Sequence, residues 1–360
     1  MDMITIMLLG PSLNAVSGVS THLNQMYRSS LSRDFHLVHF QVGSEGRGES
    51  SAGKFLRLLI SPFQFVTALV RLRPDIVHVN TSMEQKSYWR DVVYVVIAKL
   101  LRKRVVYQVH GGALPEVFFA NRPLLTGLLR KVLRSADKVV LLAQRELHAY
   151  RRFDQSLPLA VIPNAIDLVA DPYGKQMHAR PLLLVYVGRL AASKGVFELL
   201  AALALVRSAG AMATLKIAGS GPAEAALRAQ VIQLKLQDAV TFLGPVFGQE
   251  KDKLWECADL FGFPTHHEGL PYALLESMAA RTPALVCPVG AIPDVMQDGV
   301  HGLFVAPQDP QALAQAILRL DKDRDLLHSM GQACRQRIES YYSLERLAQD
   351  FRDTYGAMHR

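Results

Sequence analysis

The chain has 360 residues, half of them hydrophobic, which is enough to bury the cores of two α/β domains and argues against a disordered protein. Its three cysteines (Cys257, Cys287 and Cys334) are widely spaced and include no CxxC pair. This usage predicts a reduced cytosolic protein without a disulfide framework or a zinc knuckle. The net charge is +8, and residues 1–170 hold all of the excess, with 21 Lys and Arg against 12 Asp and Glu.

The basic first half calls for an anionic partner. No aromatic-basic platform or recognition motif for nucleic acid stands out in it, so an anionic membrane surface is the interpretation that we favour. Residues 1–10 lack a basic region and are typical of a first strand rather than a signal peptide. The apolar stretch 92–101 is interrupted by Lys99 and is too short to cross a bilayer, so we expect no membrane span.

Strand-like and helix-like segments alternate through the first half of the chain. The patterns predict strands over 4–9, 36–42, 76–80, 104–109 and 138–142. They predict helices from Thr21 and over 54–73, 91–102 and 124–134. The Gly- and Ser-rich residues 44–54 predict a mobile loop, and Pro62 predicts a kink or a break in the amphipathic helix 54–73.

Two residues of this half are candidates for a binding site. Gly18 stands in the first strand-to-helix loop, where a glycine lets the backbone approach a ligand, although the loop is not a GxGxxG fingerprint. His110 follows a predicted parallel strand, at the end where open α/β sheets bind their ligands. A histidine with a purely structural role in the loop is the alternative for that position.

The second half repeats the alternation and places basic residues after its first strand. Strand 182–187 leads into a loop in which Arg189 and Lys194 flank four positions, a pair that suits a diphosphate because guanidinium binds two oxygens and ammonium supplies a point charge. Strand 213–218 ends at Gly219, and the strand and loop 240–246 contain Gly244.

The most distinctive stretch, 266–276, reads His-His-Glu-Gly-Leu-Pro-Tyr-Ala-Leu-Leu-Glu. A buried strand precedes it and Pro271 favours a helix start, so free N–H groups and the positive end of a helix dipole would face a phosphate. The two carboxylates are Glu268 in the loop and Glu276 on the first or second helical turn. From spacing alone, a surface acid plus a helix acid is equally compatible.

Together with the strand 283–287 and the loop 289–294, this motif resembles the nucleotide-sugar site of retaining glycosyltransferases of family 4. The resemblance covers nearly the whole chain and is densest over 186–306. It implies an α/β protein of the GT-B class, with two Rossmann-like doubly wound domains, a cleft between them and a C-terminal helix that crosses back to the first domain. The implied parts are an acceptor-binding domain 1–167, a linker 168–180, a donor-binding domain 181–342 and the returning helix 343–360.

The resemblance also implies roles for the candidate residues. Arg189 and Lys194 would hold the donor diphosphate, Glu268 and His110 would act at the donor sugar, and Glu276 would bond the ribose. The remaining donor-binding candidates are Gly18, Gly219, Gly244, Gly269, Leu270 and Pro271.

The reaction so implied moves a hexose-type sugar from a UDP- or GDP-sugar, without a metal or other cofactor. The acceptor would be a polyprenyl-linked or other lipid-linked molecule or an oligosaccharide, in assembly of cell-surface polysaccharide or glycolipid. The enzyme would work in the cytoplasm, in peripheral contact with the inner face of an anionic cytoplasmic membrane. Same-face attack assisted by the leaving phosphate and double displacement through Glu268 both remain open.

Other functions and sites were weighed against these. A sugar-nucleotide epimerase of similar build and a non-catalytic nucleotide-sugar-binding protein remain alternatives, whereas a pyridoxal-phosphate phosphorylase would need a far longer chain. The acidic run 321–325 reads as a solvated helix face rather than a metal site. His266 and His267 lack a further ligand nearby, so no metal site is expected.

Overall fold

The computed structural model describes residues 3–44, 50–168 and 181–359. Contacts divide the chain into two compact units, the first comprising Met1–Asp167 with Ser343–Arg360 and the second comprising Leu168–Tyr342. Most of the expected linker, residues 169–180, lies outside the described residues.

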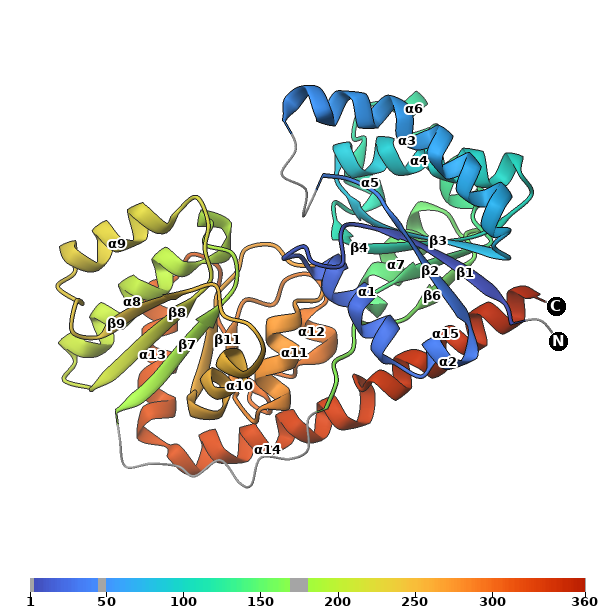
Figure 1. Cartoon of the computed structure of the whole chain (residues 1–360). Coiled ribbons are helices and arrows are strands. Elements are labelled where there is room, and N and C mark those ends of the chain that lie inside the picture. Colours follow the sequence, from blue (N-terminus) through green and yellow to red (C-terminus); the bar gives the residue numbers. More distant parts are fainter. Residues whose placement is uncertain (1–2, 45–49, 169–180, 360) are drawn as a thin grey trace. The chain divides into compact units, whose positions relative to one another are not determined.

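The described part of the first unit forms a parallel six-stranded sheet of order β2-β1-β3-β4-β5-β6 (Figure 1). Its strands are β1 (Thr5–Gly10), β2 (His36–Gln41), β3 (Ile76–Met83), β4 (Arg104–Gly112), β5 (Lys138–Leu141) and β6 (Leu159–Val161). Its helices are α1 (Gly18–Arg28), α2 (Leu31–Asp34), α3 (Ser51–Leu72), α4 (Gln85–Leu100), α5 (Pro115–Phe118), α6 (Pro123–Ser135), α7 (Gln144–Phe153) and α15 (Leu344–His359).

The helices of the first unit cover both faces of its sheet. On one face, side chains of α3, α4, α6 and α7 join one apolar cluster with the strands. On the other face, α1, α2 and α15 join a second cluster, in which Phe351 and Tyr355 of α15 are fully buried. Strands that are buried on both faces read as apolar runs rather than alternating ones, as β1 does.

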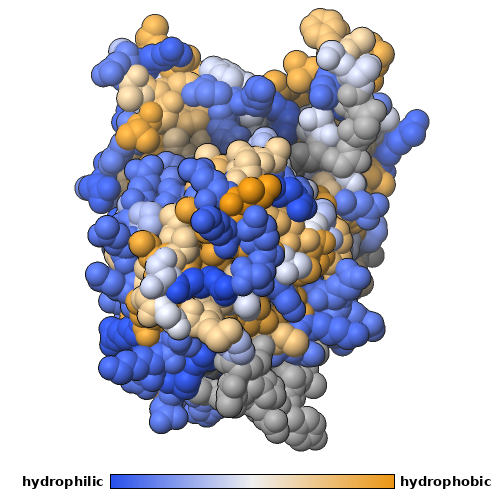
Figure 2. Space-filling view, turned by 90° about the vertical axis from the view of Figure 1, so that its left-hand side faces the viewer, coloured by the Kyte–Doolittle hydropathy of each residue, from blue (hydrophilic) through white to orange (hydrophobic). Residues whose placement is uncertain are grey.

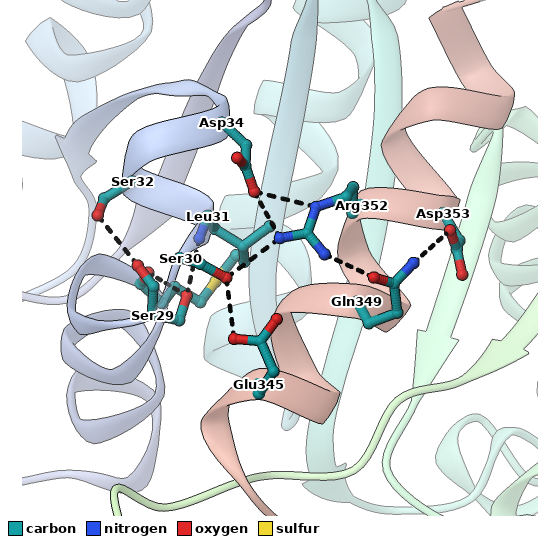
Figure 3. A network of polar contacts seen from close by, with 10 residues as sticks. Ser29, Ser30, Leu31, Ser32, Asp34, Glu345, Gln349, Arg352 and Asp353 are labelled. Atoms are coloured by element: carbon teal, nitrogen blue, oxygen red, sulfur yellow. Dashed lines mark hydrogen bonds and ion pairs between the residues drawn. The ribbon is translucent and has the colours of Figure 1, made fainter.

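Polar contacts also fasten α15 to the first unit. Arg352 donates to Asp34 Oδ2 at 2.6 Å and to Ser30 Oγ at 3.1 Å, and Ser30 Oγ lies 3.3 Å from Glu345 Oε2 (Figure 3). An isolated parallel bridge joins Ile166 to Ser343 just before the helix. The expectation that the last helix returns to the first domain is confirmed.

The second unit has a parallel six-stranded sheet in its described part, of order β12-β11-β10-β7-β8-β9. Its strands are β7 (Leu182–Val187), β8 (Ala213–Ala218), β9 (Val240–Gly244), β10 (Leu260–Phe263), β11 (Ala284–Val286) and β12 (Gly302–Phe304). Its helices are η1 (Ala192–Lys194), α8 (Val196–Ser208), α9 (Glu224–Gln233), α10 (Gly248–Cys257), α11 (Tyr272–Ala279), α12 (Ile292–Val295), α13 (Pro310–Lys322) and α14 (Arg324–Tyr341). Two doubly wound units confirm the expected fold class.

Several local expectations were wrong. The first helix begins at Gly18 rather than Thr21, because Ser17 caps it by accepting from Ser20 N at 3.3 Å. α4 begins six residues before the expected start, and α7 was not expected at all. The expected loop 44–54 is helical from Ser51, and its residues 45–49 lie outside the described part.

The helix with Pro62 inside it also differs from the expectation of a break. α3 runs unbroken over 22 residues, because losing one N–H donor leaves the bonds of the flanking turns in place. By length and composition it could cross a membrane, and it is the one such helix among the described residues. The expectation of no membrane span considered residues 92–101, whereas the longer apolar helix is α3.

Candidate functional site

In the second unit, the topology places the candidate donor residues at one sheet edge. Strand order reverses between the neighbours β7 and β10, because β8 and β9 continue on one side and β11 and β12 on the other. Ligands of open parallel sheets bind beyond the carboxyl ends of the strands at such a reversal. The loop with Arg189 and Lys194 follows β7, and the loop 264–271 follows β10.

Backbone and side-chain contacts hold these two loops together. His266 N donates to Ser193 O at 2.9 Å, and the ammonium of Lys194 forms an ion pair with Glu268 Oε1. Thr265 Oγ1 lies 3.2 Å from the same carboxylate oxygen. The side chains of Lys194 and Glu268 are 24% and 12% exposed, so the pair is shielded but reachable by a ligand.

Arg189 stands in the same loop with an exposed side chain. Its carbonyl accepts from Tyr186 O–H at 2.9 Å, which fixes the backbone at the end of β7. Burial raises the pKa of Tyr186, and the Glu268 carboxylate raises it further. Among the described residues, none forms an ion pair or hydrogen bond with the Arg189 guanidinium, so its five donors can all face a ligand.

Glu276 occupies the second turn of α11, for which Pro271 is the N-cap residue. Its carboxylate accepts from Lys251 Nζ at 2.7 Å, and the two side chains are 20% and 28% exposed. Burial, and then the charge of Glu276, raise the pKa of the neighbouring Tyr272. Each of the two candidate carboxylates thus has a lysine partner from a different element.

Close backbone approaches explain two glycines around this edge. Gly219 has φ +138°, and a Cβ there would lie 1.9 Å from the carbonyl oxygen of Gly188. Gly290 has φ +56°, and a Cβ there would lie 1.9 Å from the carbonyl oxygen of Glu268. Ala291 N also donates to Gly269 O at 3.0 Å, so the loop after β11 braces the backbone that carries Glu268.

The remaining donor-binding candidates of the second unit lie nearby in the fold. Gly244, at the end of β9, accepts from Gly219 N at 2.8 Å, which ties those two turns together. Leu270 directly precedes Pro271, the N-cap residue of α11, and its side chain is buried. These residues supply backbone shape rather than side-chain chemistry.

In the first unit, His110 lies near the carboxyl end of β4, inside the strand rather than after it. Asn80 Nδ2 donates to Leu9 O at 3.1 Å, which turns Asn80 Oδ1 toward His110 Nε2 at 2.9 Å. His110 therefore carries its proton on Nε2, and Nδ1 keeps a lone pair. Nδ1 is buried and accepts no hydrogen bond from any described residue.

Two further buried histidines of the first unit, His22 and His78, influence the electrostatics of His110. The rings of His22 and His110 meet edge to face at 4.7 Å. His78 Nε2 donates to Gln108 Oε1 at 2.9 Å, and Tyr355 O–H donates to His78 Nδ1 at 2.6 Å. Burial lowers the pKa of His22 to about 4 and that of His78 to about 3, and burial followed by these two neighbours holds the pKa of His110 well below its usual range.

Gly18 does not occupy the loop in which it was expected. It is the first residue of α1, and a Cβ at this position would meet no atom within 4 Å among the described residues. Nothing in the local backbone therefore requires a glycine there.

The acidic and histidine motifs that we weighed as metal sites have structural partners. Asp323 caps α14 by accepting from Leu326 N at 2.9 Å, and Asp321 forms an ion pair with Arg324. His266 Nε2 lies 3.0 Å from Glu198 Oε1, a contact that anchors the loop after β10 to α8. Over residues 3–44, 50–168 and 181–359, no three His, Cys, Asp or Glu side chains gather as a possible metal site.

Two sequence families together match most of the chain. The family described as glycosyltransferase family 4 matches residues 16–169, and that described as glycosyl transferases group 1 matches residues 175–337. The chain belongs to the GT-B glycosyltransferases. Its first unit corresponds to the family 4 match and its second unit to the group 1 match.

Individual members of this family show how far the similarity extends. A glycogen synthase of Mycobacterium tuberculosis is 31% identical over 203 residues, 56% of this chain and 49% of that protein. A GDP-mannose-dependent phosphatidylinositol monomannoside mannosyltransferase of the same species is 28% identical over 268 residues, 69% of each chain. The chain thus spans about half the length of the first curated relatives that it matches.

Solved structures of glycosyltransferases share the fold over the full length. The sucrose-phosphate synthase of Thermosynechococcus elongatus superposes with a TM-score of 0.79 at 21% identity, covering 99% of both chains.

Sequence reasoning missed several residues around the candidate sites of this glycosyltransferase. Lys251 lies in a polar, charged helix where nothing marks it as the partner of Glu276. Asn80 and His22 come from elements far from His110 in sequence, and only the sheet order brings them together. His22 does carry a usable signal, because it is a polar residue on the face of α1 that faces the core.

Proposed function

We propose that this protein is a retaining glycosyltransferase that moves a hexose-type sugar from a UDP- or GDP-sugar to a lipid-linked or oligosaccharide acceptor. The observation that carries the proposal is the pair of lysine-bound glutamates, Lys194–Glu268 and Lys251–Glu276, at the carboxyl-end edge where β7 and β10 meet. A site built for an anion alone would have no use for two carboxylates. Sugar and ribose hydroxyls give them partners on the same ligand.

Arg189 and Lys194 bind the diphosphate in this proposal. A dianionic diphosphate competes with Glu268 for the Lys194 ammonium, and Arg189 adds a bidentate contact. As the bond from the anomeric carbon to the phosphate oxygen breaks, negative charge grows on the leaving group, and these two cations and the N-terminal end of α11 stabilise it. The diphosphate leaves with the electron pair of that bond.

The two glutamates take different parts of the donor. Release of Lys194 toward the phosphate frees Glu268 to accept hydrogen bonds from sugar hydroxyls, which orients the anomeric carbon. Glu276 keeps Lys251 as a neutralising partner and accepts from the ribose. Gly219, Gly244, Gly269, Leu270 and Pro271 shape the backbone around the nucleotide.

His110 supplies a neutral acceptor in the first unit. Its Nδ1 lone pair can accept a hydrogen bond from a hydroxyl of the donor sugar or the acceptor without adding a positive charge. In same-face transfer the acceptor oxygen bonds to the anomeric carbon while the acceptor proton passes to the departing phosphate oxygen. Retention follows without an enzyme-linked sugar, and the site needs no metal or other cofactor.

Charge and one relative support the acceptor and the place of action that we propose. The excess of basic residues lies in the first half, and the name of the mycobacterial mannosyltransferase specifies a phosphatidylinositol-linked acceptor and a GDP-sugar. We therefore assign a polyprenyl-linked or other lipid-linked glycan acceptor, in cell-surface polysaccharide or glycolipid assembly. The protein works in peripheral contact with the inner face of an anionic cytoplasmic membrane, and nucleic acid is not a partner.

The test is incubation of the protein with labelled UDP- and GDP-sugars and a lipid extract, with and without EDTA, followed by NMR of the product's anomeric centre. A glycolipid with the donor's anomeric configuration, formed equally well in EDTA, is the expected result. Epimerised donor would favour the epimerase, and tight donor binding without turnover would favour the binding protein. Activity that is lost in EDTA and restored by manganese would contradict the metal-free assignment.

A further inference from the structure

The first half of α3, residues 51–60, projects from the first unit with almost no packing. Of its apolar side chains, Phe55 is 67% exposed, and Leu56, Leu58, Leu59 and Ile60 are between 42% and 57% exposed. Further along the helix, Phe63, Val66, Val70 and Leu72 are also exposed. Only 11% of the most apolar window of α3 is buried.

This pattern differs from that of an ordinary surface helix. Such a helix buries one apolar stripe and turns polar residues outward. In α3 the buried stripe is Ser61, Phe65 and Leu69, all in the second half, whereas residues 54–60 are apolar around most of the helix circumference. A contiguous apolar surface of this kind marks an interaction site.

The charges around α3 select the partner. The helix contains Lys54, Arg57 and Arg71 and no acidic residue. Residues 50–104, from the turn before α3 to the start of β4, hold ten Lys and Arg against three Asp and Glu. An exposed apolar helix within basic surroundings is complementary to anionic lipid. The acyl chains can contact the apolar side chains, and the negative headgroups attract the basic ones.

A neighbouring helix extends the same surface. α4 packs beside α3, with Tyr94 O–H donating to Ser61 Oγ at 2.8 Å. Its outer residues Trp89, Val93, Val96 and Leu100 are between 42% and 77% exposed. Along the upper edge of Figure 2, the side on which α3 lies in Figure 1, hydrophobic residues reach the surface.

We propose that α3 docks the first unit on an anionic lipid bilayer by lying in the headgroup region with residues 51–60 inserted among the acyl chains. The proposal rests on the membrane location in the proposed function and names the surface responsible for it. α3 does not span the bilayer in the folded protein, because Phe65 and Leu69 are committed to the core. The ten free residues reach about 15 Å, roughly half of a hydrocarbon core of about 30 Å.

The test is sedimentation of the full chain with vesicles of phosphatidylcholine alone or with phosphatidylglycerol, at low and high salt. The wild-type protein should bind the anionic vesicles and lose affinity with salt. The double substitution Phe55→Asp and Leu59→Asp should weaken binding at least tenfold. A matched double substitution in the second unit, Met212→Asp and Ile232→Asp, removes equally exposed apolar residues and should leave binding unchanged.

Two further variants separate charge from insertion. Lys54→Ala and Arg71→Ala should each weaken binding to anionic vesicles about fivefold at low salt. A tryptophan placed at Leu59 in a Trp89→Phe background should be quenched by lipids brominated on the acyl chains, whereas one at Met212 should not be.

Other outcomes would overturn the docking proposal. Equal binding by the α3 double variant and the wild type would remove α3 from the contact. Concentration-dependent dimerisation that the same variant abolishes, without vesicle binding by the wild type, would assign the surface to a second copy of the chain. Vesicle binding requires no substrate, so its presence without sugar transfer would refute the proposed enzyme function and leave the docking surface intact.

Discussion

The two units share one architecture and differ in what stands at the carboxyl ends of their strands. The second unit presents exposed or partly exposed ions there, with Lys194 and Lys251 bound to glutamates and Arg189 turned to solvent. The first unit presents His110 there, with a buried Nδ1 and with its ring against that of the buried His22. The same sheet architecture thus carries charged side chains near the strand ends of one unit and an uncharged imidazole near those of the other.

In the proposed reaction, this difference gives the two units separate roles in sugar transfer. In the reaction that we propose, a leaving diphosphate needs cations that can reorganise when it arrives, and this role falls to the lysine–glutamate pairs of the second unit. An entering hydroxyl needs an acceptor that does not repel or attract charge strongly. In the proposed reaction His110 has this role, because burial and then its histidine neighbours hold its pKa well below the usual range and so keep it neutral.

The largest effect is expected at Glu268, which pairs with Lys194 and, in the proposed reaction, orients the donor sugar. Glu268→Gln keeps the size of the side chain but removes the charge that positions the donor sugar, so we expect kcat to fall by about 100-fold or more. The comparison variant Glu276→Gln should chiefly raise the Kd for the donor. Steady-state kinetics and calorimetry on both variants measure the split, and equal losses of kcat would contradict separate roles.

A smaller loss is expected at Arg189. A charge-assisted contact to phosphate contributes about 1.5–3 kcal/mol, so Arg189→Ala should weaken binding of the free nucleoside diphosphate roughly tenfold or more. Calorimetry measures it directly. Arg228→Ala is the matched control, since Arg228 is an exposed arginine that pairs with Glu224 of its own helix, α9. Unchanged affinity in a folded Arg189 variant would remove this residue from the site.

The candidate donor site of the second unit could be predicted from sequence because its residues lie close together along the chain. The arginine and lysine share one loop, the two glutamates lie eight residues apart, and the strands before each loop are continuous apolar runs. Sheet order then only had to bring two loops together. Lys251 escaped this reasoning because a lysine in a polar helix has no pattern that separates a site residue from a solvated one.

The histidine cluster was out of reach for a different reason. Its members come from α1, β3 and β4, with Tyr355 contributed by the last helix, and their contacts exist only after the sheet has formed. For α3, the sequence predicted the helix but not how it packs. Its composition suggested an amphipathic helix, but sequence alone could not show that its apolar residues remain outside the core.

The smallest effect concerns acid stability and tests the comparison between the units. His22 and His78 have pKa values of about 4 and about 3 when folded, against about 6.5 when unfolded, so the unfolded chain binds more protons below pH 6.5. The contribution of the two neutral histidines to the free energy of unfolding is therefore present above pH 6.5. It is lost as the pH falls from 6.5 through about 4 for His22 and about 3 for His78. At pH 6 each histidine lowers the free energy of unfolding by roughly 1 kcal/mol, a several-fold change in the unfolding constant.

Hydrogen-exchange protection factors resolve this loss by unit. Between pH 7 and pH 6, amides of β3 and β4 should lose protection through His22, His78 and His110, whereas amides of β7 and β10 should lose less, through His301, whose pKa burial also lowers. His78→Gln should remove about a third of the pH dependence in the first unit, while His328→Gln, at an exposed position of α14, should leave it unchanged. An equal pH dependence in the two sheets would show that the histidines do not set the acid stability of the first unit, and their neutrality would then no longer distinguish the two units.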